Sequence, residues 1–467
     1  MDQRARIPVT LPLPNPTPSY WQTPPSPLAN HRTTPTLPPS ADIIIIGSGI
    51  TGASAAWHLL STSIPPPTIL MLEARQTSSG ATGRNGGHTK AASYRTFPAH
   101  AAALGLPAAV QLARFELDTI RAVHAFARDH GIECDLAACD TVDVLYDAAQ
   151  WEEARGAVEA MREAMPGEVE GGAARYVLYE GEEVKRRFRV VDDGEEVCGG
   201  VGYFAGSLSA YRFAVGVVGM CVARGMGLHT GTAVTGLERD GGSGRWRVET
   251  GRGVVEAGRV VLATNGWTAG LVREFQGVVV PLRGQVQVHR PGRGLKEGGP
   301  LEGTYSFIYE DGYEYMVPRP VGAKGEGDIM MGGGLAKAPE GGLLEYGTTD
   351  DTVVEETVSW YLEQTTARYF GKNWGEDDGQ GRVKSEWTGI MGFSPDGFPF
   401  VGEVPGKKGL WISASFQGHG MVLAWKSAQA LVEMMEGRDD EKLAAWFPSA
   451  FRVSEERMAK RFEGRLQ

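Results

Sequence analysis

The sequence predicts an α/β protein in which a Rossmann-type dinucleotide-binding domain is interleaved with a mixed-sheet α+β domain. Three observations support this fold class. The ordered chain begins with a β-branched strand that runs into a glycine-rich turn and a helix, and further strand-like segments recur as far as residue 414. The length of 467 residues, with ample apolar content, is enough for two domains.

Residues 1–40 are expected to form an extended N-terminal arm, because prolines crowd this segment. Proline removes a backbone donor and disfavours both a regular helix and a central strand. Tyr20 and Trp21 suggest that part of the arm packs on the folded body, since large aromatic side chains favour burial. A disordered leader is the alternative interpretation.

The first ordered elements read as strand, helix and strand. Asp42 to Ile46 has the β-branched character of a strand that is buried on both faces of a parallel sheet. Ala53 to Leu60 is expected to be a short helix, which the prolines at 65–67 stop before a second strand at Thr68 to Leu72. This order is typical of a dinucleotide-binding unit.

Later segments alternate between helical and strand-like patterns. Residues 100–190 have apolar positions at helical spacing, 245–263 suggest a hairpin leading into a buried strand, and 276–384 contain pieces of a second sheet. A strand at 410–414 and a helix at 421–435 follow. The expected domains are the arm at 1–40, a cofactor domain at 41–98, 199–275 and 385–437, a substrate domain at 99–198 and 276–384, and a tail at 438–467.

The turn at residues 47–52 matches the G-x-G-x-x-G pattern between a predicted strand and a predicted helix. In that context the first glycine makes the turn, the second admits a pyrophosphate and the third lets the helix meet the sheet. Glu73 follows the second strand, where a carboxylate can accept hydrogen bonds from ribose hydroxyls. Its charge also disfavours the 2′-phosphate of NADP, so FAD and NAD remain.

A second glycine-rich segment at residues 79–87 follows closely after Glu73. Its backbone donors favour a large ligand, with Arg84 near phosphate or flavin oxygens. A flexible turn is the alternative interpretation. Taken in order, the motifs resemble the FAD-dependent amine oxidoreductases of the D-amino-acid oxidase or glycine oxidase type, and the loop at 79–87 is most similar to the branch that contains gamma-glutamylputrescine oxidoreductase.

The resemblance covers Ala41 to about Gly437 and also includes segments at 260–267, 281–285, 387–399 and 416–421. It implies a glutathione-reductase-like FAD-binding domain and noncovalently bound FAD. The motifs and the resemblance together predict these cofactor-binding residues: Gly47, Gly49, Ile50, Thr51, Gly52, Glu73, Ala74, Arg75, Ala81, Thr82, Arg84, Asn85, Gly86, Gly87, Val234, Thr264, Asn265, Gly266, Trp267, Gly418, His419, Gly420 and Met421.

Two positions depart from the sarcosine oxidases of this family. The cysteine that attaches their flavin corresponds to Gly389, and the lysine that holds their substrate carboxylate corresponds to Val422. The resemblance therefore implies neither covalent attachment by that route nor recognition of a small N-methyl amino acid.

Three residues are candidate catalytic residues. His419 lies between glycines at an expected helix start, where acid/base work and purely structural hydrogen bonding are both open. Trp387, like Tyr315, could wall a pocket for a cationic amine, although aromatic residues at strand spacing are often core. Arg319, like Arg283, could bind a carboxylate through two hydrogen bonds, or could brace a loop.

Net charge and cysteine content limit the kinds of binding partner that this chain is expected to have. A net charge of −11 disfavours nucleic acid and anionic membranes and leaves a small-molecule substrate. The four cysteines have no disulfide or metal spacing, so no metal is expected. No secretion signal precedes the fold, and residues 464–467 do not spell a peroxisomal address, so the expected location is the cytoplasm.

The predicted function is oxidation of a C–N bond in an amine or amino acid. By the resemblance, hydride passes to flavin N5, the imine hydrolyses and O2 reoxidises the flavin to give H2O2. Two alternatives stay open: an FAD-dependent 2-hydroxy-acid dehydrogenase or NADPH-reduced hydroxylase on a related fold, and a binding protein that has lost the chemistry. The sequence does not predict the oligomeric state.

Overall fold

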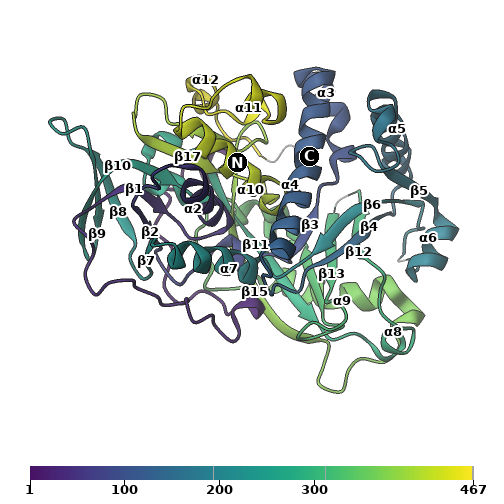
Figure 1. Cartoon of the computed structure of the whole chain (residues 1–467). Helices are drawn as coiled ribbons and strands as arrows, with labels where there is room; N and C mark the ends of the chain where they lie inside the picture. The colour runs from purple at the N-terminus through teal and green to yellow at the C-terminus, as the bar shows by residue number, and fades with distance from the viewer. Residues whose placement is uncertain (193, 311, 465–467) are drawn as a thin grey trace.

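The computed structural model describes residues 1–192, 194–310 and 312–464 of the chain. Of the C-terminal tetrapeptide, only Gly464 falls within these ranges, so the prediction about a peroxisomal address concerns residues outside them. Figure 1 shows two sheets side by side, with helices packed against both. In the described ranges, no helix has the length and apolar character needed to cross a bilayer.

The first sheet contains the predicted dinucleotide-binding strands, and its central strands are parallel. Its main order is β16-β17-β10-β1-β2-β7, with β9 pairing to β10 and β8 pairing to β9. Strands β1, β2, β7, β10 and β17 run parallel to their neighbours in this order, whereas β16, β8 and β9 add antiparallel edges. The bounds are β1 Ser40–Ile46, β2 Ile69–Leu72, β7 Gly227–His229, β8 Val234–Arg239, β9 Trp246–Thr250, β10 Gly253–Leu262, β16 Phe400–Glu403 and β17 Leu410–Ala414.

Four helices pack together on one face of the first sheet. They are α2 (Ile50–Thr62) and α10 (Gly420–Met435), which contact its strands, α7 (Ala210–Ala223), which packs on α2, and α4 (Leu106–Asp129), which packs on α10. Small side chains on α2, such as Ala53 and Ala56, are fully buried, so this helix packs closely against its neighbours. The start of α2 is thereby held at the carboxyl end of β1.

The second sheet is mixed, as predicted. Its order is β15-β11-β14-β13-β12-β4-β6-β3, with β5 pairing to β6, and all pairs are antiparallel except β12 with β4. Its strands are β3 His88–Lys90, β4 Ala137–Leu145, β5 Tyr176–Glu180, β6 Gly199–Ser207, β11 Val280–His289, β12 Thr304–Tyr309, β13 Gly312–Pro318, β14 Ile329–Gly333 and β15 Val383–Phe393. The remaining helices are α1 Asp2–Ala5, α3 Phe97–Leu104, α5 Ala148–Ala164, α6 Gly181–Phe188, α8 Arg293–Glu297, α9 Glu356–Phe370, α11 Glu441–Trp446 and α12 Glu455–Ala459.

The chain passes between the two sheets four times, after β2, after β6, after β10 and after β15. The sheets divide the chain differently from the expected domain segments, because β3, β6 and most of β15 lie in segments assigned to the cofactor domain but pair in the second sheet. Strands β4 and β5 lie in the region where the sequence suggested only helices. The first four residues of β4, at 137–140, include two alanines and an aspartate, which are uncommon in strands, so the local sequence predicts this strand only weakly.

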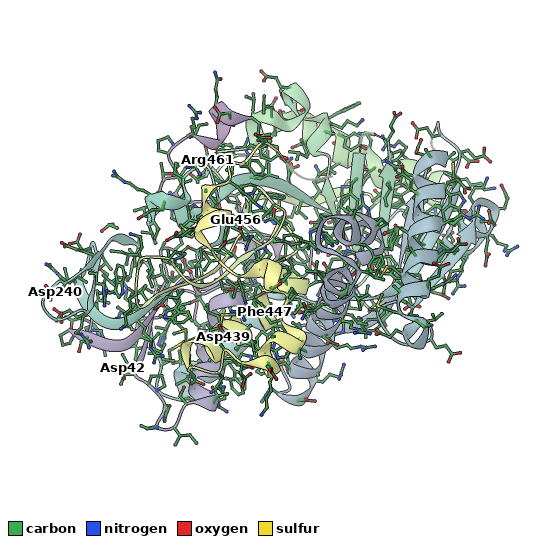
Figure 2. The ribbon with its side chains drawn as sticks, turned by 90° about the horizontal axis from the view of Figure 1, so that it is seen from above. Asp42, Asp240, Asp439, Phe447, Glu456 and Arg461 are labelled. Carbon is green, nitrogen blue, oxygen red and sulfur yellow. The ribbon has the colours of Figure 1, made fainter. Side chains whose placement is uncertain are left out.

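Both ends of the chain pack on the body. In the arm, Trp21 is only 5% exposed and its Nε1 donates a hydrogen bond of 2.6 Å to the carbonyl of Asn85, which agrees with the packed interpretation rather than the disordered one. In the tail, Phe447 is buried against Phe115 of α4. Figure 2 shows the C-terminal segment that carries Phe447 lying across the core, while Asp240 marks the far end of the first sheet.

Candidate active site

A cavity of about 2000 Å³ lies between the carboxyl ends of the first-sheet strands and the second sheet. Ile46, Leu72 and Ala263 line it at the ends of three parallel strands, and Leu282 and Tyr315 line it from the second sheet. Pockets for a single small ligand usually measure roughly 300–1000 Å³. The cavity therefore has room for a dinucleotide and a separate substrate.

The turn between β1 and α2 has the geometry that its glycines require. Gly47 has φ +105°, and a Cβ there would lie 2.5 Å from the carbonyl oxygen of Ala263. A Cβ at Gly52 would overlap the carbonyl oxygen of Gly47. The first N–H groups of a helix have no intrahelical partner, so those of α2 that follow Ile50 present donors and a positive dipole end to the cavity.

Glu73 faces this turn. Its carboxylate accepts hydrogen bonds from Ser48 N at 3.1 Å, Ser48 Oγ at 2.7 Å and Arg75 N at 3.0 Å. Glu73 also lines the cavity, as expected for a ribose-binding carboxylate. The second glycine-rich segment closes on the same turn, because Ile50 N donates to Thr82 Oγ1 at 3.0 Å. The sequence did not reveal this direct contact between the two motifs.

Arg84 is engaged by the protein. Its side chain is only 2% exposed and donates to the carbonyls of Thr388 at 2.6 Å, Thr17 at 2.7 Å and Ser79 at 3.0 Å. Burial lowers the pKa of Arg84 to about 10. Arg84 borders the cavity, but its guanidinium donates to these carbonyls and to Thr17 Oγ1 rather than into the space, which corrects the expectation of a phosphate-facing guanidinium.

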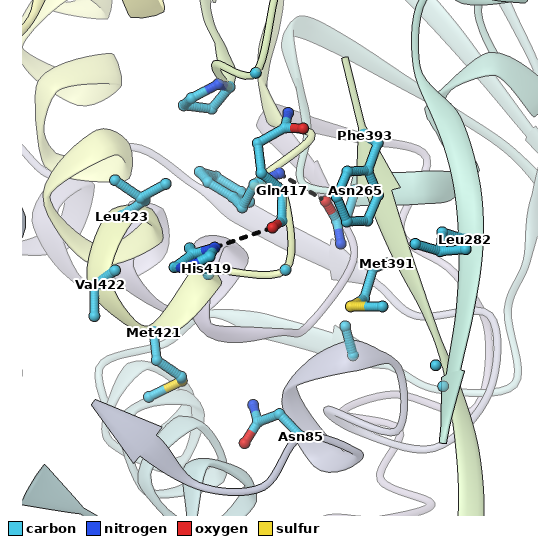
Figure 3. Close-up of a pocket in the computed structure, with 18 of the residues that line it drawn as sticks. Asn85, Asn265, Leu282, Met391, Phe393, Gln417, His419, Met421, Val422 and Leu423 are labelled. Atoms are coloured by element: carbon cyan, nitrogen blue, oxygen red, sulfur yellow. Dashed lines mark hydrogen bonds between the residues drawn. The ribbon is translucent and has the colours of Figure 1, made fainter. Parts of the chain in front are cut away.

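A third wall forms where β10 and β17 end. The side-chain oxygen of Asn265 accepts hydrogen bonds from Ser415 N at 3.0 Å and Phe416 N at 3.3 Å, which joins the two strand ends. His419 is the residue before α10, and its Nδ1 donates to the carbonyl of Gln417 at 3.1 Å. Figure 3 shows His419 on one side of the pocket and Met391 and Phe393 on the other, with Gln417 between them. The N-terminus of α10 therefore opens onto the cavity.

The structure gathers most of the predicted cofactor residues around this cavity. All of them line it except Gly52, Gly87 and Gly266, whose close backbone contacts instead shape the surrounding turns. The donor-rich turn, the carboxylate after β2 and the second helix N-terminus suit the pyrophosphate, ribose and flavin of FAD respectively.

Two of the predicted catalytic residues do not reach the cavity. Trp387 is fully buried, and its Nε1 donates to the carbonyl of Arg84 at 2.7 Å, so it braces the glycine-rich loop from behind. Arg319 is 4% exposed, pairs with Asp135 and lies with Cζ 4.8 Å from the ring centroid of Trp21. Both side chains point into the packed interior, a direction that strand spacing alone does not fix.

Of the arginines considered for carboxylate binding, Arg283 does reach the cavity but already binds a carboxylate. Its Nε and Nη2 lie 2.6 Å and 3.0 Å from the two oxygens of Glu345. Two other cations line the cavity and have no ion pair with a described residue. They are Arg95, with Cζ 5.1 Å from the ring centroid of Tyr313, and Lys337, near the ring of Tyr361.

The sequence also missed a buried polar cluster on the second-sheet side. Lys90 Nζ donates to Asp143 and Ser306, while the other oxygen of Asp143 accepts from Tyr94 at 2.9 Å and Tyr203 at 2.8 Å. Burial, followed by the charge of Asp143, raises the pKa of Tyr94 well above its ordinary value. Lys90 and Tyr94 line the cavity, so this cluster forms part of its wall.

Two further titratable groups border the cavity. Burial raises the pKa of Glu116 to about 7, partly opposed by a hydrogen bond from Ser93. Burial, and then the charges of Lys90 and His419, holds the pKa of His88 well below its usual range. His88 is therefore neutral near pH 7, with Nε2 2.7 Å from Thr304 Oγ1.

Comparison with known proteins gives consistent matches. The model of the DAO family, described as FAD dependent oxidoreductase, matches residues 42–434. A glycine oxidase of Pseudomonas aeruginosa is 28% identical over 214 residues, which is 45% of this chain and 50% of that protein. The probable oxidoreductase OrdL of Rhizobium meliloti is 23% identical over 448 residues, which is 90% of this chain and 91% of that protein.

A solved structure shows the same fold. The crystal structure of glycine oxidase from Geobacillus kaustophilus matches with a TM-score of 0.67 and 19% identity, covering 90% of this chain and 99% of the other. This chain spans about half the length of the curated glycine oxidases that it matches in sequence. The likeness in structure therefore establishes the fold and leaves the substrate open.

Proposed function

The chain belongs to the DAO family of FAD dependent oxidoreductases, and on this premise we propose that it oxidises the C–N bond of an amine or amino acid. The observation that carries the proposal is a single cavity onto which the β1–α2 turn and the N-terminus of α10 both open, and which continues along a wall of tyrosines and basic side chains. FAD needs the first two features, and an amine substrate needs the space beyond them.

Bound FAD would supply the acceptor for hydride and would return the electrons to O2 as H2O2. The protein supplies the environment for this chemistry. The N-terminus of α10 favours negative charge beside it through its dipole and its unpaired N–H groups. Leu282, Met391, Phe393 and Met421 give the neighbouring space an apolar lining, which excludes water.

The substrate amine must lose its ammonium proton before hydride can leave the adjacent carbon. Two imidazoles border the cavity, that of His88 and that of His419 at the start of α10. Because burial and neighbouring charges lower the pKa of His88 and so disfavour its protonated form, we assign His419 the role of proton acceptor. Among the described residues, Arg95 and Lys337 are the cavity cations without an ion pair, and Arg95 is our candidate for a substrate carboxylate. The imine product hydrolyses in water.

The proposal is tested by an anaerobic screen of the purified yellow protein. Amines, polyamine conjugates and amino acids are added one by one, and loss of flavin absorbance is followed. Bleaching by an amine, with H2O2 formed after air is admitted, is the expected result. Bleaching by 2-hydroxy acids or by NADPH alone would overturn the proposal in favour of the alternative activities. Turnover with an artificial dye but not with O2 would identify a dehydrogenase.

The flavin is expected to be released by acid precipitation, because Gly389 offers no thiol for covalent attachment. A colourless protein that cannot be reconstituted with FAD would contradict the whole proposal. A location in the cytoplasm and a small-molecule partner remain predictions from the sequence.

A further inference from the structure

The N-terminal arm lies against the same cavity as the cofactor motifs. Met1 and the segment Thr10–Pro12 line it, although the family match begins only at residue 42. Met1 packs beside the cluster that contains Leu282 and Phe393. The arm therefore borders the cavity at more than one point, from outside the part of the chain that defines the family.

The arm crosses the end of the cavity that suits adenosine. Glu73, after β2, marks the ribose position of a dinucleotide. Two residues further on, Arg75 donates from Nη1 to the carbonyl of Leu13 at 3.2 Å. The arm residues just before Leu13 are those that line the cavity. Trp267, whose ring centroid lies 5.7 Å from Arg75 Cζ, borders the same end.

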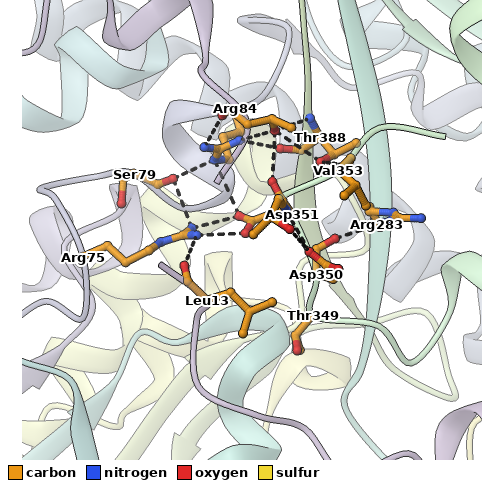
Figure 4. A network of polar contacts seen from close by, with 12 residues as sticks. Leu13, Arg75, Ser79, Arg84, Arg283, Thr349, Asp350, Asp351, Val353 and Thr388 are labelled. Atoms are coloured by element: carbon orange, nitrogen blue, oxygen red, sulfur yellow. Dashed lines mark hydrogen bonds and ion pairs between the residues drawn. The ribbon is translucent and has the colours of Figure 1, made fainter. Parts of the chain in front are cut away.

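A buried carboxylate fastens the arm to the cofactor loops. Asp351 has a fully buried side chain, and its two oxygens each lie 2.9 Å from an Nη atom of Arg75. Arg84 Nε lies 3.7 Å from the same carboxylate. The backbone carbonyl of Asp351 accepts from Thr17 N at 2.8 Å, and the carbonyl of Thr17 accepts from Arg84. Figure 4 shows Arg75, Arg84 and Leu13 around Asp351.

This network is costly to break, since two buried guanidiniums depend on one carboxylate. Additional contacts hold the arm on either side of it. Thr10 Oγ1 lies 2.7 Å from Thr349 Oγ1, and Ser19 Oγ donates to the carbonyl of Gly83 at 2.6 Å. Gly83, Arg84 and Arg75 belong to the cofactor loops themselves. The same contacts therefore hold the arm in place and fix the shape of those loops.

We propose that the N-terminal arm is part of the FAD site, where Thr10–Pro12 covers the adenosine half of the cofactor and Asp351 holds the arm closed through Arg75 and Arg84. Leu11 and Pro12 offer apolar surface to the purine nucleoside, and the arm must lift before the cofactor can leave. By reciprocity, bound FAD stabilises the docked arm. The inference requires only that the protein binds FAD, not that it oxidises an amine.

The test measures FAD rather than turnover. Holoenzyme is diluted, and the release rate and Kd of FAD are followed by flavin fluorescence for the native chain, for a chain lacking residues 2–12, and for the Leu11→Ser/Pro12→Ser variant. We expect Kd to rise roughly tenfold or more in both, because losing one or two apolar contacts costs about this factor. Asp351→Asn is expected to raise the release rate as well.

The matched control is Asp328→Asn. Asp328 holds the arm at another point, where Tyr20 Oη donates to it at 2.8 Å, and the described contacts of its carboxylate are with Tyr20 and Lys384 rather than with Arg75 or Arg84. This variant is expected to retain the native Kd for FAD within about twofold. In a second measurement, FAD should slow proteolysis of the arm in the native protein.

Unchanged Kd and release rate in a folded chain without residues 2–12 would overturn the proposal. If Asp351→Asn does not fold, the deletion and the Leu11→Ser/Pro12→Ser variant still decide it. An equal loss of FAD in Asp328→Asn would overturn the role assigned to Asp351, because FAD release would then follow loosening of the arm at any point rather than loss of its contacts with Arg75 and Arg84. Failure of amine oxidation leaves these measurements unaffected.

Discussion

The two sides of the cavity are built by different means. On the first-sheet side, Gly47 and Gly52 allow backbone segments to approach closely, and helix N-termini provide the polar groups. On the second-sheet side, Lys90 forms a buried ion pair with Asp143, 53 residues away, and a hydrogen bond with Ser306, 216 residues away. Close backbone packing thus allows a short motif to predict the first-sheet side, which we call the cofactor side. The second-sheet side, which we call the substrate side, depends on distant partners because its charges are buried.

Removing Asp143 should cause the largest loss of unfolding free energy, through contacts that lie on the substrate side. Asp143→Ala leaves the buried ammonium of Lys90 without its carboxylate, which costs about 3–5 kcal/mol of unfolding free energy. Urea unfolding followed by circular dichroism measures this loss. Asp140→Asn on the same strand breaks only an exposed pair with Arg175 and should cost about 0–1 kcal/mol. Equal effects of the two variants would contradict the comparison.

Adding a methyl group at Gly52 should destabilise the β1–α2 turn on the cofactor side. Gly52→Ala places a Cβ against the carbonyl oxygen of Gly47, so we expect a loss of about 1–3 kcal/mol and weaker FAD retention. The flavin-to-protein absorbance ratio after gel filtration checks this prediction. Gly241→Ala serves as the control, because no atom lies within 4 Å of a Cβ there. A variant that keeps full FAD content would show that the turn tolerates movement.

Arg95 allows the substrate side to be tested without unfolding it. Arg95→Gln removes a guanidinium that has no ion pair with a described residue, so stability and FAD content should stay unchanged. For substrates that carry a carboxylate, KM should rise about tenfold at constant kcat. Steady-state kinetics with an amino acid and with its uncharged amide distinguishes the outcomes. An equal change for both substrates would remove Arg95 from carboxylate binding.

Replacing Glu116 should have a smaller effect on the unfolding free energy, and this effect should depend on pH. Burial raises the pKa of Glu116 from an ordinary 4.5 to about 7 in the folded protein, so the folded state binds this proton more tightly than the unfolded state. Its contribution to stability is full below pH 4.5 and is lost as the pH rises to 7. Glu116→Gln should therefore raise the unfolding free energy at pH 8 by about 1 kcal/mol and change it little at pH 4.5. Denaturant titrations at both pH values provide the check, and the same gain at both would contradict it.

Much of the first sheet follows from local sequence. The β-branched run at 42–46, the glycines after it and the strand at 410–414 each predict their element without reference to distant residues. Glu73 is also predictable, because its distance from the turn fixes its place at the end of β2. These features depend on backbone conformation, which short segments determine.

The substrate side could not be predicted in the same way. Nothing local to Asp143 indicates that Lys90 and Tyr203 will surround it, since the three lie on different strands. Trp387 illustrates the opposite error, because its residue type suggested a pocket wall while its strand register directs it into the core. The side of a sheet that a residue faces depends on register, which is set by tertiary pairing.

The four passages of the chain between the sheets restrict how the cavity can open. A hinge between two lobes needs a small number of linkers that bend together. Here four linkers, one of them carrying the glycine-rich segment at 79–87 that lines the cavity, would have to bend at once. Rigid-body opening would therefore distort the cofactor site itself. Substrate entry is therefore expected at the rim, where residues of α3 and α5 border the cavity away from the strands that join the two sheets.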